Sequence, residues 1–196
     1  MASAPLSFTI CKVTSEGDFL PLATVEEAAF TGPQTTLFFG SSSNQASLAV
    51  ARHTKIFRTD PTAIYFKAVL ENTNQIIGLA KWNLFSTSGP HFPWPTTGFA
   101  EDANTELLSW FFGQLDEKRN ALMDQRERVK ESGYLYMAIL AVDPKYQRWV
   151  LGGNYLSGDW RRRIERGWSA GLRRIRRGNR CMRRWGGGRW GLRMWS

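Results

Sequence analysis

Several features that mark well-known classes of protein are missing from this chain. It has no run of about 18 apolar residues, which excludes a membrane-spanning helix. Residues 1–8 lack a basic start followed by an apolar core, so we expect no secretory signal. The chain also lacks a Gly-x-Ser-x-Gly elbow and a phosphate-binding loop ending in Gly-Lys-Ser or Gly-Lys-Thr. The usual signatures of serine hydrolases and of P-loop proteins are therefore absent.

Cysteine and histidine are scarce. The two cysteines, Cys11 and Cys181, are too few for a disulfide framework. The two histidines, His53 and His91, lie far apart in the sequence with no Cys-x-x-Cys pair nearby, so we expect no metal site. Together these absences favour an intracellular, reducing compartment, the cytoplasm or the nucleus.

The excess of positive charge is confined to one part of the chain. The 196 residues carry a formal net charge of +9, yet residues 1–148 hold 13 basic and 15 acidic side chains. Residues 149–196 hold 13 arginines, no lysine, two acids, six of the nine tryptophans and ten of the 18 glycines. One domain rarely changes composition so sharply. We therefore predict one domain over 1–148, followed by a poorly ordered Arg/Trp/Gly-rich tail over 149–196.

The pattern of apolar residues in the first part alternates between strands and helices. Proline and glycine clusters separate the elements, with a loop over 86–98. The predicted strands cover 7–13, 62–71, 75–85 and 134–142, and the predicted helices cover 19–30, 35–58 (with a break at 41–43) and 103–130. The two middle strands read as a hairpin. Strand 134–142 is almost continuously apolar, which is typical of a strand buried on both faces. This order predicts an α/β or α+β sheet domain.

The most informative motif runs from Ile139 to Arg148, Ile-Leu-Ala-Val-Asp-Pro-Lys-Tyr-Gln-Arg. A buried strand that leads into the start of a helix can present unpaired backbone N–H groups to an anion. The motif resembles the central motif of GNAT superfamily N-acetyltransferases of the fungal type. The resemblance extends over most of residues 7–148 and includes the segments 78–83, 94–95 and 111–115. It implies a GNAT-like mixed sheet of mostly antiparallel strands flanked by helices, truncated here after the central buried strand.

The resemblance also implies a co-substrate, acetyl-CoA, and the residues that hold it. The backbone of the strand would pair with the pantetheine arm, and the following turn would hold the pyrophosphate through its N–H groups. The corresponding positions are Leu140, Ala141 and Val142 for pantetheine, and Gln147, Arg148, Gly152 and Gly153 for the turn. Val150 stands where the family has glycine, so the turn departs from the pattern. The acceptor would be a small-molecule or peptide amine, and no residue is assigned as general base or acid.

The tail lacks the helix and the Tyr-Glu-x-x-Gly-Phe/Trp motif that the family carries after this point. Arg, Trp and Gly share codons of the form CGG, TGG and GGG, which differ only in the first base. Back-translating residues 154–160 and skipping two bases gives Leu-Phe-Glu-Trp-Gly-Leu, and residues 180–187 at the same offset give Val-Tyr-Glu-Ala-Val-Gly-Trp. Our hypothesis is that the chain is out of frame from about Trp149. We then expect impaired acetyltransferase activity, poor solubility, and an open edge and an open apolar face on strand 134–142.

The alternative is that the tail has a function of its own. Arginines could bind phosphates while tryptophans stack on bases, as in a nucleic-acid-binding protein. A basic helix around 173–177 could instead lie on an acidic membrane. The reading-frame hypothesis is favoured because it explains both the composition and the missing motifs. Incidental binding of polyanions is expected in either case.

Two weaker sets of candidates lie in the first part. Glu71, Glu101 and Asp102 could serve as bases on the acceptor side, but surface roles are favoured. Trp82 and Trp94 could line an acceptor pocket, although packing is the more common role of such aromatics.

Overall fold

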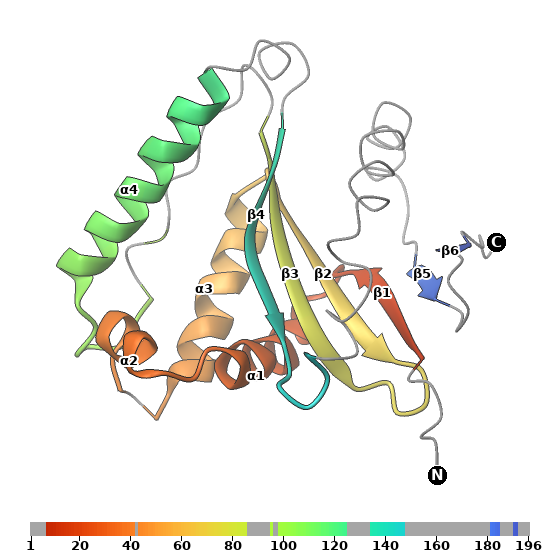
Figure 1. The fold of residues 1–196 in the computed structure, drawn as a ribbon. Coiled ribbons are helices and arrows are strands. Elements are labelled where there is room, and N and C mark those ends of the chain that lie inside the picture. Colours follow the sequence, from red (N-terminus) through yellow and green to blue (C-terminus); the bar gives the residue numbers. More distant parts are fainter. Residues whose placement is uncertain are drawn as a thin grey trace.

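An antiparallel sheet lies at the centre of the computed structural model (Figure 1). The structure describes residues 7–41, 43–85, 95, 98–121 and 134–147, and the backbone alone of 122–124, 181–184 and 190–191. The strands are β1 (Phe8–Lys12), β2 (Ala63–Leu70), β3 (Ile76–Phe85), β4 (Tyr134–Val142), β5 (Cys181–Arg184) and β6 (Trp190–Gly191). Their order is β4-β3-β2-β1-β5-β6, and every ladder among them is antiparallel.

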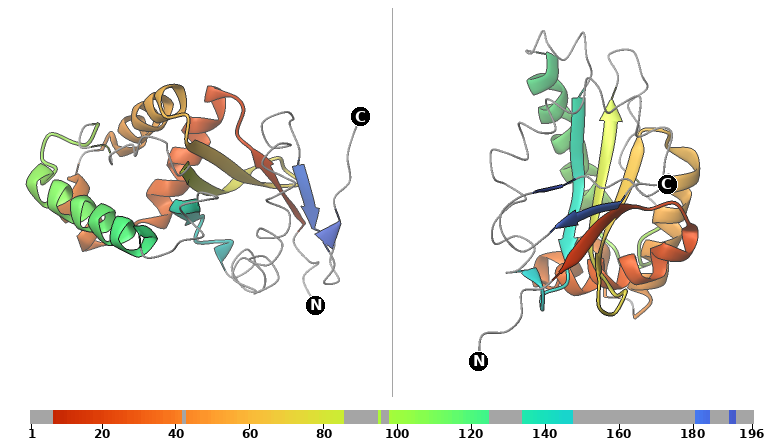
Figure 2. Two further views of the ribbon diagram at one scale, coloured as in Figure 1. Left: turned by 90° about the horizontal axis from the view of Figure 1, so that it is seen from above. Right: turned by 90° about the vertical axis from the view of Figure 1, so that its right-hand side faces the viewer.

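The strands predicted in the first part of the sequence are all confirmed, and β2 and β3 form the expected hairpin. The two short strands β5 and β6 continue the sheet beyond β1, as both views in Figure 2 show for β5. Cys181 lies opposite Cys11 in this ladder, and Cys11 is disulfide-bonded, a cross-link that the sequence did not predict. The rest of the predicted tail lies outside the described residues.

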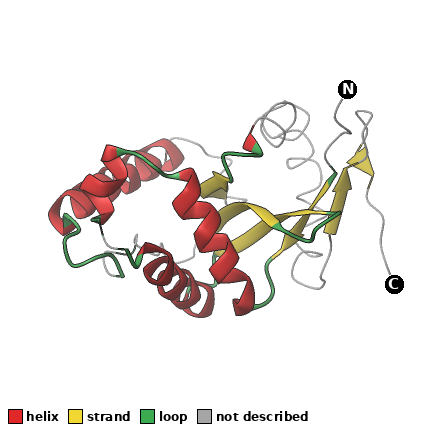
Figure 3. Ribbon diagram, turned by 90° about the horizontal axis from the view of Figure 1, so that it is seen from below, coloured by secondary structure: helices red, strands yellow, loops and turns green. Residues whose placement is uncertain are grey.

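The helices lie beside the sheet and beyond one of its ends (Figure 3). They are α1 (Phe19–Ala29), α2 (Pro33–Phe39), α3 (Gln45–Thr59) and α4 (Thr105–Asp124), and a 3-10 turn (Glu16–Asp18) precedes α1. The predicted break between the second and third helices is confirmed at residues 40–44. The first half of α4 lies beside α2, where the rings of Phe38 and Phe111 are 5.1 Å apart. The coarse prediction of a mixed α and β domain with a helix-flanked antiparallel sheet is therefore confirmed.

Apolar packing covers both faces of the sheet unequally. On one face, α1 packs through Phe19, Leu22 and Val25 against Tyr65 and Leu79. The other face has a smaller buried cluster that consists of Phe8, Ala68, Leu70, Ile77 and Val142. The larger cluster therefore fixes how α1 and α3 lie against the sheet.

The prediction from its apolar pattern that β4 is buried on both faces is wrong for most of its length, whereas the open edge expected for an out-of-frame chain is present among the described strands. Only Ala141 and Val142 are buried, and Met137 is 39% exposed. The reason is its position, because among the described strands β4 pairs only with β3 and forms an edge of the sheet. In the described ranges, no helix has the length and the hydropathy needed to cross a bilayer.

Candidate functional site

The outer edge of β4 is the first part of the candidate site. The backbone N–H of Asp143 donates to the carbonyl of Ile77 on β3 at 3.0 Å. Successive residues of an antiparallel strand direct their backbone groups to opposite sides. Val142 and Leu140 therefore direct theirs away from β3, whereas Ala141 directs its groups toward it. Within the described residues no other strand pairs with this edge, so a ligand with peptide-like groups could bind along it.

A bulge interrupts the ladder in the middle of β4. Lys81 lies opposite Ile139 and Trp82 lies opposite Met137, which leaves Ala138 without a partner in register. A bulge bends a strand and changes the direction of the groups on either side of it. The edge that includes Leu140 and Val142 thus begins just after a bend.

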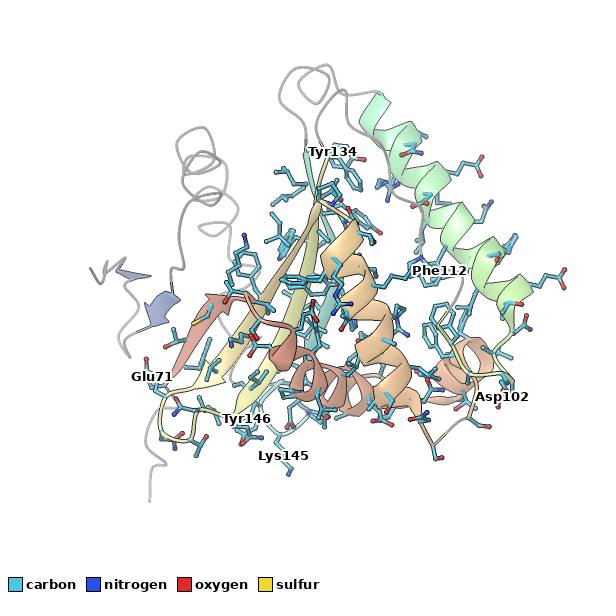
Figure 4. The ribbon with its side chains drawn as sticks, turned by 180° about the vertical axis from the view of Figure 1, so that it is seen from behind. Glu71, Asp102, Phe112, Tyr134, Lys145 and Tyr146 are labelled. Carbon is cyan, nitrogen blue, oxygen red and sulfur yellow. The ribbon has the colours of Figure 1, made fainter. Side chains whose placement is uncertain are left out.

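A tight turn follows β4 directly. The carboxylate of Asp143 accepts from the backbone N–H of Lys145 at 2.9 Å, and its carbonyl accepts from the N–H of Tyr146 at 2.8 Å. The side-chain amide of Gln147 donates to the carbonyl of Val142 at 3.2 Å. Lys145 and Tyr146 lie at one end of the sheet and Tyr134 lies at the other (Figure 4). The turn is therefore held by its own side chains at the end where the anion site was predicted.

Four of the seven predicted cofactor residues lie together at this end of β4. Leu140, Ala141 and Val142 form the last residues of the strand, and Gln147 folds back onto it. The remaining three, Arg148, Gly152 and Gly153, lie outside the described residues. The roles assigned to all seven stay predictions.

Sequence reasoning missed a buried polar cluster between α1, α3 and the sheet. His53 is fully buried, and its Nε2 contacts a carboxylate oxygen of Glu26 while its Nδ1 lies 3.1 Å from the hydroxyl of Tyr65. Arg52 pairs with the same carboxylate at 3.3 Å. Three separate elements supply these residues, so no local spacing in the sequence could have revealed the cluster.

The charge state of this cluster follows from its surroundings. Burial alone would raise the pKa of Glu26, but the hydrogen bond from His53 and the nearby charges of His53 and Arg52 outweigh it and lower the pKa. Burial, and then the charge of Glu26, raise the pKa of Tyr65. Tyr65 therefore stays protonated, its hydroxyl is hydrogen-bonded to Nδ1 of His53, and Nε2 of His53 contacts an ionised Glu26.

Lys81 lies next to this cluster. It is 5% exposed and lies opposite Tyr65 in the ladder of β2 and β3. Burial lowers the pKa of Lys81, although the charges of Asp60 and Glu26 oppose the shift. Asp60 is itself held by the side chains of Thr62 and Asn83 at 2.6 and 2.9 Å. The described residues thus include a cluster around His53 and a second around Asp60, each held by hydrogen bonds between its own side chains.

Two of the weaker candidates from the sequence, Glu71 and Asp102, have structural roles. Glu71 accepts from the hydroxyls of Ser7 and Thr9 at 2.7 and 2.8 Å, which ties the start of β1 to the end of β2. Asp102 accepts from both the hydroxyl and the backbone N–H of Ser41, and these hydrogen bonds lower its pKa. The favoured surface roles of these two acids are therefore supported.

No group of three or more His, Cys, Asp or Glu side chains in the described ranges is arranged to hold a metal ion. Comparison of the chain with protein-family models, with curated proteins and with solved structures finds no match in any of the three.

Proposed function

We propose that residues 1–148 form the first part of an acetyl-CoA-dependent N-acetyltransferase of GNAT type, and that its activity is impaired in this chain. The observation that carries the proposal is the outer edge of β4, which is unpaired within the described part of the sheet and leads directly into the turn at Asp143. The resemblance of residues 139–148 to the family motif supports the same assignment. The same proposal includes the fold, which we infer to be a GNAT-like sheet truncated after β4.

The chemistry of the edge fits the co-substrate. Pantetheine contains amide groups, which need backbone donors and acceptors in a row. Leu140 and Val142 direct such groups outward, and Gln147 already shares the carbonyl of Val142. Binding would therefore use the N–H and C=O of Leu140 and the N–H of Val142 most readily.

The reaction would be a direct transfer between the two substrates. The amine nitrogen attacks the acetyl carbonyl, the C–N bond forms, the C–S bond breaks, and the departing thiolate takes up a proton. An N–H at the edge of β4 would polarise the carbonyl oxygen as charge develops on it. The Tyr-Glu-x-x-Gly-Phe/Trp motif that supplies the family's usual acid is absent from residues 149–196. The only tyrosine there, Tyr155, stands in no such motif, which is why we expect the step to be slow.

Binding of acetyl-CoA to the full chain tests the assignment of the edge. We expect weak binding, with a Kd of about 1 mM, since the pyrophosphate turn departs from the family pattern. Leu140→Pro should abolish it, because proline removes an N–H that points away from β3 and so spares the ladder. Leu140→Ala loses the same side chain but keeps the N–H, and should bind like the wild type.

The outcomes separate the two parts of the proposal. A wild-type chain that does not bind acetyl-CoA, or a Leu140→Pro variant that binds it unchanged, would overturn the assignment to the family. A stable chain with micromolar affinity would overturn the claim of impairment instead.

The proposed cause of the impairment is a shifted reading frame, and sequencing the gene and the mature transcript across the codons for Gln147 to Gly153 tests it. A single uninterrupted frame with no displaced GNAT-like sequence beneath it would reject the reading-frame hypothesis.

A further inference from the structure

A disulfide ties together the two compositionally different parts of the chain. Cys11 is disulfide-bonded, and Cys181 is the only other cysteine in the sequence. The two residues lie opposite each other in the ladder of β1 and β5, and these two strands lie side by side in Figure 2. The bond therefore attaches the arginine-rich part of the chain to the sheet that residues 1–148 build.

The register of the ladder brings the two cysteines to a separation that a disulfide can span. The backbone N–H of Val13 donates to a carbonyl of β2 at 2.9 Å. Because successive residues direct their backbone groups to opposite sides, Cys11 also directs its groups to β2, whereas Ile10 directs its groups to β5. Ile10 and Met182 are thus a hydrogen-bonded pair. Cys11 and Cys181 are a non-hydrogen-bonded pair, whose Cα atoms lie about 4.5 Å apart, within the range of disulfides.

The ladder between β1 and β5 is short without this bond. Its register covers three residue pairs, and the hydrogen-bonded pair among them is that of Ile10 and Met182. The net gain from so few hydrogen bonds is small, whereas ordering the four residues of β5 costs conformational entropy at each of them. The disulfide reduces that cost because it keeps β5 close to β1 at all times. We therefore expect the pairing of β5 with β1 to depend on the disulfide.

The disulfide is also placed where it can react. Cys11 is half-buried and not enclosed in the core, so a small thiol has access to it. In a reducing compartment, which the sequence favours, disulfides are usually transient and redox-sensing. We propose that Cys11 and Cys181 form a reversible redox pair, with glutathione as its exchange partner, that holds β5 on β1 when oxidised and releases it when reduced. This inference does not depend on the proposed acetyltransferase function or on the origin of residues 149–196.

Glutathione alone balances the exchange. A glutathione thiolate attacks one sulfur of the pair, the S–S bond breaks, a mixed disulfide forms, and the released cysteine thiolate takes up a proton. A second glutathione thiolate then attacks the mixed disulfide, which yields oxidised glutathione and the second cysteine thiol. Release of β5 leaves the backbone N–H and C=O of Ile10 without the strand they pair with. Unpaired edge groups of this kind promote pairing between chains, so the reduced chain should associate more readily.

Hydrogen exchange of the full chain, resolved to single amides and measured before and after treatment with reduced glutathione in native buffer, tests the proposal. We expect glutathione to reduce the pair without denaturant, and the amides of Ile10 and Met182 then to exchange at least about tenfold faster. Thr9 and Cys11 are internal controls, because their N–H groups are directed to β2, and their exchange should not change. A disulfide that resists glutathione, or an unchanged rate at Ile10 after reduction, would overturn the proposal. Equal acceleration at Thr9 and Cys11 would also overturn it, since the whole sheet would then be opening.

Serine variants provide the second arm. Cys11→Ser and Cys181→Ser each remove the bond, so in both the amide of Ile10 should exchange as in the reduced wild type, within about twofold, whatever the redox buffer. Lys12→Gln is the matched control, since it changes the neighbour of Cys11, keeps both cysteines and should respond to glutathione as the wild type does. A difference between the two serine variants would overturn the proposal, because one bond needs both sulfurs. An oxidised wild type that migrates as a disulfide-linked dimer would overturn it as well.

Discussion

At the scale of single residues, the chain has buried polar groups that depend on one another. The hydroxyl of Tyr65 is hydrogen-bonded to Nδ1 of His53, the Nε2 of His53 contacts Glu26, and all three residues lie between the helices and the sheet. Tyr65→Phe would leave Nδ1 of His53 buried without this hydrogen-bond partner. We expect the free energy of unfolding to fall by about 1–3 kcal/mol, the cost of an unsatisfied buried group. Urea unfolding measures it.

The control for this variant is Tyr146→Phe, which removes a hydroxyl from a half-buried side chain in the turn after β4. No hydrogen bond of that hydroxyl to another described residue is present, so its loss should change the free energy of unfolding by less than about 0.5 kcal/mol. Equal effects of the two variants would mean that the hydrogen bond to His53 does not stabilise the fold.

Glu26 makes the stability of the same cluster depend on pH. Its pKa in the folded chain lies below the unfolded value, so its contribution is complete above about pH 4.3 and disappears as the pH falls through the folded pKa. Glu26→Gln should therefore be less stable than the wild type at neutral pH and show a flatter decline below about pH 4.3.

Chemical unfolding at a series of pH values between neutral and strongly acid measures this difference. Glu27→Gln is the control, since Glu27 is the next residue on α1 and is exposed. Its profile should follow that of the wild type. If Glu26→Gln and the wild type decline in parallel through the acid range, the ion pair with His53 and Arg52 does not contribute to stability.

The residue scale is also where the sequence was least informative. Glu26, His53 and Tyr65 come from three elements, and Arg119 meets Phe85 and Tyr136 from two others. The roles of these residues depend on tertiary contacts, which the periodicity of apolar residues does not reveal. Leu140, Ala141, Val142 and Gln147 were found because they lie in one continuous motif, where a strand end and a turn follow each other directly.

At the scale of elements, the break between α2 and α3 depends on a glycine. Gly40 ends α2 with φ of 84°, and a Cβ placed there would lie 2.2 Å from Oδ1 of Asp102. That carboxylate holds Ser41, so it cannot move without losing its two hydrogen bonds. Gly40→Ala should lower the free energy of unfolding by about 1–3 kcal/mol through strain at this backbone angle and through the clash.

Gly113 in α4 is the matched control, because it is helical and a Cβ there would meet nothing within 4 Å. Gly113→Ala should raise the free energy of unfolding by about 0.5–1 kcal/mol, since alanine is the better helix former. Thermal and urea unfolding of both variants should give changes of opposite sign. A neutral Gly40→Ala would show that the contact between the α2 end and Asp102 is not fixed.

The ends of helices and strands were predicted well, because residues nearby in the sequence determine them. The burial of a strand was predicted poorly, because it depends on the elements packed beside it. The break at residues 40–44 could be predicted because serine and glycine end helices by themselves. The apolar pattern of β4 wrongly predicted burial on both faces, because such a pattern does not tell how many strands lie beside a strand; the open edge was expected only from the reading-frame hypothesis. Met137 is exposed for that reason, on a strand whose length was predicted correctly.

At the scale of the whole molecule, the charge is divided between two unlike parts. Residues 1–148 are slightly acidic in total, whereas residues 149–196 carry the whole excess of positive charge. The described residues that build the sheet and its helices belong almost wholly to the first part, and β5 and β6 come from the second. The two parts should thus behave independently toward charged partners.

Binding to polyanions tests this division. The full chain should bind heparin and RNA in a salt-dependent manner that does not depend on base sequence. Replacing Arg173, Arg174, Arg176 and Arg177 with glutamine should lower the eluting salt concentration and make the salt dependence shallower. The matched control replaces four exposed basic residues of the first part, Lys55, Arg58, Lys118 and Lys145, and should bind nearly as the wild type does. Selectivity for one RNA sequence would contradict incidental binding, because contacts to phosphates alone carry no sequence information.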